Sequence, residues 1–147
     1  MDLLTAAIIL AVLLTATVIL GLVIRWRDGR PRSVSHEETV DPLRLGAAPD
    51  ALGRTATLLQ FSTATCSRCP GVHRLLASLA GEEEGVAHLD VDLTDRPDIA
   101  RHFNVLQTPT TLVLDSRGVV RTRFGGIPGR EVVRLELLRL NGETAAV

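Results

Sequence analysis

The residues best suited to chemistry in this chain of 147 residues are Cys66 and Cys69, its only two cysteines. A disulfide-stapled scaffold carries more cysteines and uses them to join distant parts of the chain. Two cysteines separated only by Ser67 and Arg68 can pair only locally. We therefore expect a reactive thiol–disulfide centre and not a structural cross-link.

Two predicted elements position this pair. Residues 55–61 are mostly apolar and predict a central β-strand. After Cys66 the apolar residues recur at helical spacing, which predicts a helix ended by Gly81; these residues are Val72, Leu75, Leu76 and Leu79. The cysteines thus lie where a strand leads into a helix, and we expect Ser62 or Thr65 to cap that helix.

The start of a helix has unpaired N–H groups and a positive dipole end, which favour a thiolate over a thiol. The thiolate is the reactive form of cysteine. We expect Cys66 to be the nucleophile and Cys69, nearly one turn further along, to resolve the mixed disulfide. The positive charge of Arg68 should further stabilise the thiolate.

The remaining pattern predicts strands at 86–91, 110–114 and 119–124, a short helix opened by Pro97 and a final helix over 129–140. A strand–helix–strand crossover implies a parallel pair, and the last two strands form an antiparallel hairpin. We therefore predict an α/β fold with a mixed four-stranded sheet flanked by helices on both faces.

An uncharged apolar segment precedes this domain. As a helix, residues 3–24 would span about 33 Å, enough for a bilayer core of roughly 30 Å. A cleaved signal peptide has a basic start and a shorter apolar run, whereas this chain starts with Met1 and Asp2. We expect an uncleaved, single-pass transmembrane helix with Trp26 at the membrane interface.

These features predict three parts: a transmembrane anchor over residues 1–25, a basic juxtamembrane segment and linker over 26–53, and a folded domain over 54–147. From Ser33 onward there are 12 Arg against 15 Asp and Glu, a net charge of −3 with histidine neutral. A domain with that balance has no basic footprint for nucleic acid, so no nucleic-acid partner is expected.

A cluster of arginines follows the apolar segment directly, at Arg25, Arg27, Arg30 and Arg32. Basic residues beside a membrane helix are retained on the cytoplasmic side. We therefore expect the protein in the cell membrane with its folded domain in the cytoplasm. In that reducing compartment the cysteines would rest as dithiols, and the protein would act as a reductase or sulfur relay.

Residues 55–140 resemble the thioredoxin superfamily. The resemblance is carried by the strand at 58–61, by the Cys66–Cys69 motif, by Asn104 and Val105, and by Thr108-Pro109-Thr110, with Gly118 and Gly125 at the family's usual positions. It implies a thioredoxin-like fold and thiol–disulfide oxidoreductase activity in cell redox homeostasis, without a cofactor. It also implies a cis Pro109 facing the redox pair and a Thr108 backbone that binds an extended substrate.

Two positions depart from the family pattern. Thioredoxins carry a buried acid six residues before the first cysteine, where this chain has Gln60, and a tryptophan directly before that cysteine, where it has Thr65. The family's N-terminal strand and helix are not evident either. We expect a specialised relative in which Gln60 slows proton transfer. Its partners would be a disulfide-containing protein or small sulfur substrate and an electron-donating reductant.

Other interpretations of the same residues stay open. The domain could be a membrane-tethered binding module whose cysteines are a redox switch, or an extracytoplasmic thiol–disulfide exchange protein. A zinc site would need two further ligands beside the cysteines. The candidates are His36, His73, His88 and His102, and their spacing matches no zinc finger; no metal is expected.

Overall fold

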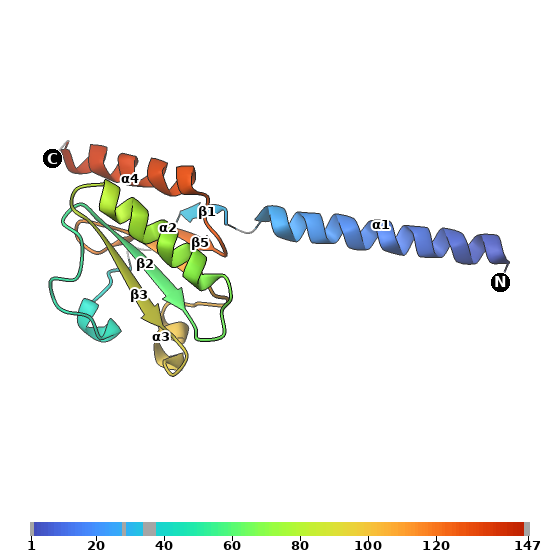
Figure 1. The fold of residues 1–147 in the computed structure, drawn as a ribbon, viewed down its shortest axis with the longest axis horizontal. Helices are drawn as coiled ribbons and strands as arrows, with labels where there is room; N and C mark the ends of the chain where they lie inside the picture. The colour runs from blue at the N-terminus through green and yellow to red at the C-terminus, as the bar shows by residue number, and fades with distance from the viewer. Residues whose placement is uncertain (1, 28, 34–37, 146–147) are drawn as a thin grey trace.

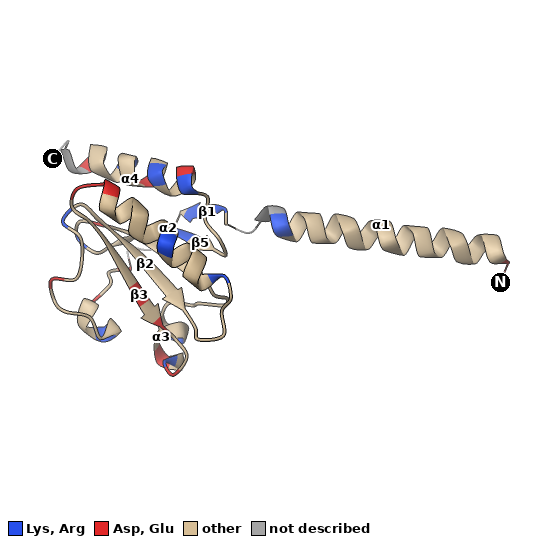
Figure 2. Ribbon diagram, viewed as in Figure 1, with Lys and Arg blue, Asp and Glu red and all other residues tan. Residues whose placement is uncertain are grey.

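The computed structural model describes residues 2–27, 29–33 and 38–145. Its first element, α1 (Leu3–Arg27), is a single long helix that projects from the folded domain (Figure 1). Large apolar side chains are exposed along α1 from Leu3 to Ile24, and the charged residues of this part of the chain lie near its two ends (Figure 2). Residues 3–25 of this helix are long and apolar enough to cross a membrane.

The domain is built on one mixed sheet in the order β1-β5-β4-β2-β3. Its strands are β1 (Pro31–Ser33), β2 (Ala56–Ser62), β3 (Val86–Asp92), β4 (Thr110–Asp115) and β5 (Val120–Gly125). The β2–β3 pair is parallel, whereas β2–β4, β4–β5 and β1–β5 are antiparallel. The predicted parallel pair and C-terminal hairpin are thus confirmed.

Helices cover both faces of this sheet. On one face, α2 (Cys69–Glu82) and α4 (Arg130–Ala145) pack on side chains that include Leu58 and Phe124. On the other, α3 (Pro97–His102) and the 3-10 helix η1 (Pro42–Leu45) pack on Leu59 and Phe61. Strand β2 is therefore buried on both faces, which explains its nearly continuous apolar sequence.

The structure differs from the sequence prediction at the edge of the sheet and in the segment expected to be a linker. Strand β1 adds a fifth strand through its pairing with β5. Val40 and Leu45 are 2 % and 6 % exposed within the core of the α3 face, and Thr39 forms a bridge to Val119. These few apolar residues lie in a polar stretch without periodicity, so their burial in the core could not be predicted from the sequence.

Two leucines of η1, Leu43 and Leu45, provide a test of this packing. Leu45→Ala should lower the free energy of unfolding by about 2 to 5 kcal/mol, because it leaves a cavity in the core. Leu43→Ala, in the same helix but at a side chain that is 64 % exposed, should change it by less than about 0.5 kcal/mol. Denaturant titration of both variants measures the difference, and equal effects would contradict the placement of η1.

Candidate active site

Cys66 and Cys69 form a disulfide in the structure, with their Cα atoms 5.5 Å apart. Cys66 lies in the turn that follows β2, and Cys69 is the first residue of α2. Cys66 is partly exposed, whereas Cys69 is only 4 % exposed. A large disulfide substrate can therefore approach Cys66 far more easily than Cys69.

The start of α2 differs from the predicted cap. Arg68 occupies the N-cap position without a side-chain cap hydrogen bond, and Pro70 lies in the first turn. The expectation that Ser62 or Thr65 caps this helix is therefore wrong, because Arg68 is the N-cap residue and the Ser62 hydroxyl donates to Asp90 Oδ1 at 2.7 Å. The Arg68 side chain is exposed and lines the same cavity as Cys66.

The Thr108–Pro109 peptide bond is cis, as the resemblance implied. Thr108 and Cys66 line one cavity of about 380 Å³, which also includes Thr63. The hydroxyls of Thr63 and Thr108 are 3.2 Å apart, and Gly126 N–H donates to Pro109 C=O at 2.8 Å. The loop before β4 is thus fastened from two sides and borders the accessible cysteine.

Gln60 lies beneath the first residue of α2. Its side chain is fully buried, and its Nε2 donates to the Cys69 carbonyl at 3.1 Å. Its Oε1 is also buried and has no hydrogen-bond partner. The structure thus places Gln60 directly against the buried cysteine, where its amide can orient the backbone but cannot accept a proton from a thiol.

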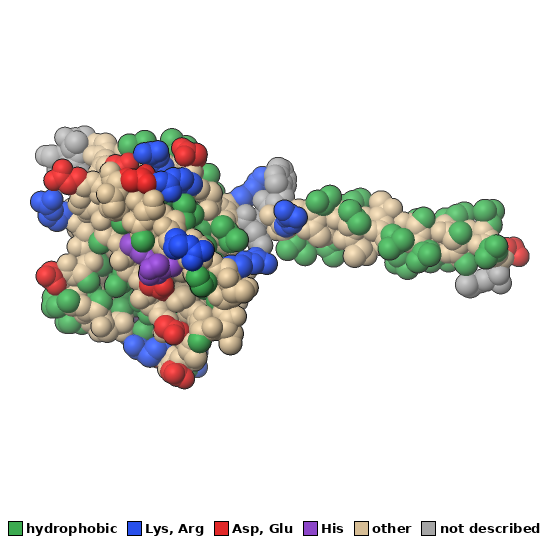
Figure 3. Space-filling view, in the orientation of Figure 1, with side chains coloured by type: hydrophobic (Ala, Val, Ile, Leu, Met, Phe, Trp, Pro, Cys, Tyr) green, Lys and Arg blue, Asp and Glu red, His purple; other side chains and the backbone are tan. Residues whose placement is uncertain are grey.

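A second cavity, of about 320 Å³, lies beside the same disulfide and is lined by both cysteines together with His73 and Asp90. His73 Nδ1 lies 2.9 Å from Asp90 Oδ2, and Ser62 donates to the other oxygen of that carboxylate. Figure 3 shows the histidine side chains gathered on this face of the domain, over α2 and β3.

His88 extends the same polar group. Its ring packs edge-on against His73, with the ring centroids 4.7 Å apart. Burial lowers the pKa of His88, the charge of His73 lowers it further, and the charge of Asp90 opposes the shift. His88 is therefore a neutral neighbour of His73 at pH 7.

The sequence prediction missed the pairing of His73 with Asp90. The available signal was that His73 follows Cys69 by four residues, which places the two on the same face of a helix. The partner on β3 becomes visible only in the three-dimensional structure. Among the described residues, no group of three or more His, Cys, Asp or Glu side chains is arranged to hold a metal ion; His36 lies outside those residues.

Comparison with models of known protein families gave no match. A thioredoxin from Mycolicibacterium smegmatis is 33 % identical over 92 residues, which cover 60 % of this chain and 81 % of that protein. A mutant thioredoxin from Halobacterium salinarum NRC-1 superposes with a TM-score of 0.53 at 16 % identity, over 60 % of this chain and 76 % of the other.

Oxidised mitochondrial thioredoxin 3 from Saccharomyces cerevisiae gives a TM-score of 0.51 at 19 % identity, over 58 % of this chain and 79 % of that one. The two solved structures support the fold, and the mycobacterial relative supports the family. Together with a local disulfide at the start of α2 and a cis-proline loop beside it, they identify the chemistry. The chain belongs to the thioredoxin superfamily and is a thiol–disulfide oxidoreductase.

Proposed function

We propose that the protein is a membrane-anchored disulfide reductase in which Cys66 attacks the substrate and Cys69 resolves the complex. The observation that carries the proposal is the unequal exposure of the two sulfur-bearing residues. Cys66 borders the open cavity that it shares with Thr108, while Cys69, the first residue of α2, is only 4 % exposed. Only one of the two can meet a bulky substrate.

In the proposed reaction the Cys66 thiolate attacks one sulfur of the substrate disulfide, which breaks and releases one substrate thiolate. Cys69, as a thiolate, then attacks the Cys66 sulfur and releases the second substrate thiolate. The substrate gains two electrons, and the enzyme is left with the Cys66–Cys69 disulfide. An external dithiol reductant must return two electrons to close the cycle.

Two features support a stabilised Cys66 thiolate. Cys66 lies in the turn three residues before the first residue of α2, near the helix N-terminus and its free N–H groups. The exposed guanidinium of Arg68 adds a positive charge nearby. For the substrate, we propose that the Thr108 backbone, fixed by Pro109, pairs with an extended segment beside its disulfide.

Resolution requires Cys69 to lose its proton, and Gln60 cannot accept it. We propose that His73 does so, because it lines the same cavity as both cysteines and lies one helical turn beyond Cys69. Its hydrogen bond to Asp90 orients the ring and stabilises the imidazolium that forms. The polar pair would thus replace the buried acid of other family members.

In this proposal residues 1–25 are the membrane anchor and the folded domain lies in the cytoplasm. The arginines that follow the apolar helix support this orientation. Arg25 and Arg27 belong to the last turn of α1, and Arg30 and Arg32 follow it closely. Basic flanks of this kind stay on the cytoplasmic side. In that compartment the cysteines rest as dithiols, which supports reduction of substrates over their oxidation.

Alkylation tests the assignment of the nucleophile. Iodoacetamide at neutral pH should modify Cys66 of the reduced protein first, because it is the more exposed thiol and the one expected to ionise. Peptide mapping by mass spectrometry after short reaction times measures the order. Faster labelling of Cys69 would reverse the assigned roles.

Turnover distinguishes a reductase from a tether with a redox switch. The full chain in detergent should catalyse reduction of insulin by dithiothreitol, and Cys66→Ser should abolish the catalysed rate. A wild-type protein that forms the disulfide but does not accelerate insulin reduction would contradict the reductase proposal.

Substitution of His73 tests the proton acceptor. His73→Gln should slow resolution of the mixed disulfide by about 10²-fold near pH 7, and the deficit should shrink as the pH rises and hydroxide takes over. His102→Gln is the matched control, since His102 lies on α3 and contacts Glu38 at 3.8 Å. Single-turnover kinetics over a pH series measure both variants, and equal behaviour of the two would rule out the role of His73.

Membrane sidedness can be measured with a membrane-impermeant maleimide added to intact cells after reduction. Cys66 should remain unlabelled until the cells are lysed, because the domain lies in the cytoplasm. Labelling before lysis would place the domain outside, and the cytoplasmic reductase would have to be replaced by an extracytoplasmic exchange protein.

A further inference from the structure

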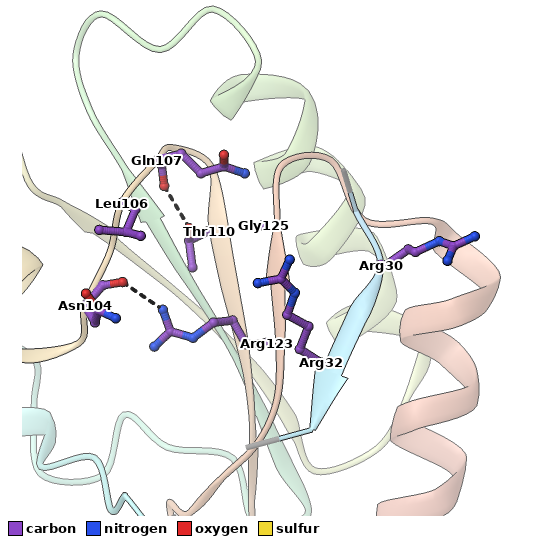
Figure 4. A pocket seen from close by; sticks show the side chains of 8 residues that line it. All are labelled: Arg30, Arg32, Asn104, Leu106, Gln107, Thr110, Arg123 and Gly125. Atoms are coloured by element: carbon purple, nitrogen blue, oxygen red, sulfur yellow. Dashed lines mark hydrogen bonds between the residues drawn. The ribbon is translucent and has the colours of Figure 1, made fainter. Parts of the chain in front are cut away.

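A third cavity, of about 270 Å³, lies on the α3 face of the sheet near the edge formed by β1. Its walls come from β1, β5 and the loop between α3 and β4 (Figure 4). The polar and charged residues of these walls are Arg30, Arg32, Asn104, Gln107, Thr110 and Arg123. Among the described residues, no acidic side chain lines this cavity.

Two of its arginines are held directly opposite each other. Arg32 on β1 pairs in register with Arg123 on β5, and opposed residues of antiparallel strands project from the same face. Like charges in such a pair destabilise the sheet. An anion that binds both guanidinium groups would remove this repulsion.

The surroundings of Arg123 leave part of its guanidinium available. It donates to the carbonyls of Phe103 and Asn104 at 2.6 and 3.2 Å, which fixes its position. A guanidinium has five N–H donors, so donors remain for a ligand. Partial burial lowers the pKa of Arg123, and the charge of Glu38 opposes that shift. A guanidinium is nevertheless always protonated in proteins.

Figure 4 separates the roles of the two arginines from the β1 segment. The Arg32 side chain extends over β5 toward Thr110, and the Arg123 side chain extends from β5 toward Asn104. Arg30 also lines the cavity, but its side chain points away from these two arginines. The site therefore depends mainly on Arg32 and Arg123.

Gln107 connects this cavity to the disulfide, because it lines both this cavity and the one that contains Cys66 and Thr108. Thr110 Oγ1 donates to the Gln107 carbonyl at 2.7 Å. The Gln107 amide also packs closely over Gly125, where a Cβ atom would approach Nε2 to 2.9 Å. The two cavities thus lie on either side of Gln107, whose position these contacts fix.

We propose that the arginine cavity binds an acidic side chain of the disulfide substrate, so that the enzyme prefers protein substrates with Asp or Glu a few residues from the reacting cysteine. The inference rests on the proposed function. An extended chain whose disulfide meets Cys66 can cross Gln107 and bring a carboxylate between Arg32 and Arg123. Arginine binds carboxylates through paired, charge-assisted hydrogen bonds.

The test compares two peptide disulfides that differ only in flanking residues, two Glu or two Gln, with the full chain in discs of zwitterionic lipid. The ratio of kcat/KM for the acidic over the neutral peptide should exceed one in the wild type and fall about threefold to tenfold in Arg32→Gln. Arg54→Gln removes the same charge from a side chain that is 82 % exposed and lines neither cavity, and it should retain the ratio. Raising the salt concentration should reduce the wild-type ratio.

The other possible outcomes would contradict the proposal in different ways. A wild-type ratio of one, or equal losses in Arg54→Gln and Arg32→Gln, would overturn the specific site for acidic side chains. Retention of an anionic phospholipid that depends on Arg32, without a peptide preference, would overturn it in favour of a lipid headgroup. If the wild type reduced neither peptide, the proposed reductase function itself would be contradicted.

Discussion

Strand β2 is buried on both of its faces, and this burial fixes the position of the active-site residues that follow it. Leu58 is held in the core under α2 and α4, and Leu59 and Phe61 are held in the core under α3. The hydrogen-bonded ladders to β3 and β4 fix the strand laterally. The end of β2 is therefore a fixed point, and the turn that carries Cys66 starts from it.

From that fixed end, short-range contacts place each part of the active site. Gln60, in the same strand, holds the carbonyl of Cys69 and so ties the start of α2 to the sheet. Ser62, the last residue of β2, holds Asp90, which in turn orients His73. On the other side, Thr63 lies against Thr108 of the cis-proline loop. The cysteines thus lie between the His73–Asp90 pair and the cis-proline loop.

The sequence alone predicted the elements that follow regular periodicity and the chemistry that is local in the chain. The β2–α2 unit with its cysteine pair, the parallel pairing with β3 and the hairpin of β4 and β5 belong to this class. Strand β1 was not predicted, because Pro31-Arg32-Ser33 has no strand-like pattern and is ordered only by pairing with β5. The burial of Val40 and Leu45 depends in the same way on distant residues.

The active site shows the same contrast between features that are local in sequence and features that depend on distant residues. The positions of Cys66, Cys69, Thr108 and Pro109 followed from the motif and the resemblance. The hydrogen bond between His73 and Asp90 and the register pair of Arg32 and Arg123 join residues far apart in sequence, so they depend on the helix-to-sheet packing and the strand register.

In the proposed reaction Cys66 forms a covalent bond to the substrate, and Cys69 then breaks it. A trapping experiment can detect this bond: the full-length Cys69→Ser protein is expressed in cells, alkylated at once, and analysed without and with reductant. We expect adducts that dissociate on reduction, that mass spectrometry maps to Cys66, and that are absent from the Cys66→Ser variant. Absence of any reducible adduct in Cys69→Ser, or stronger trapping through Cys69 in Cys66→Ser, would contradict it.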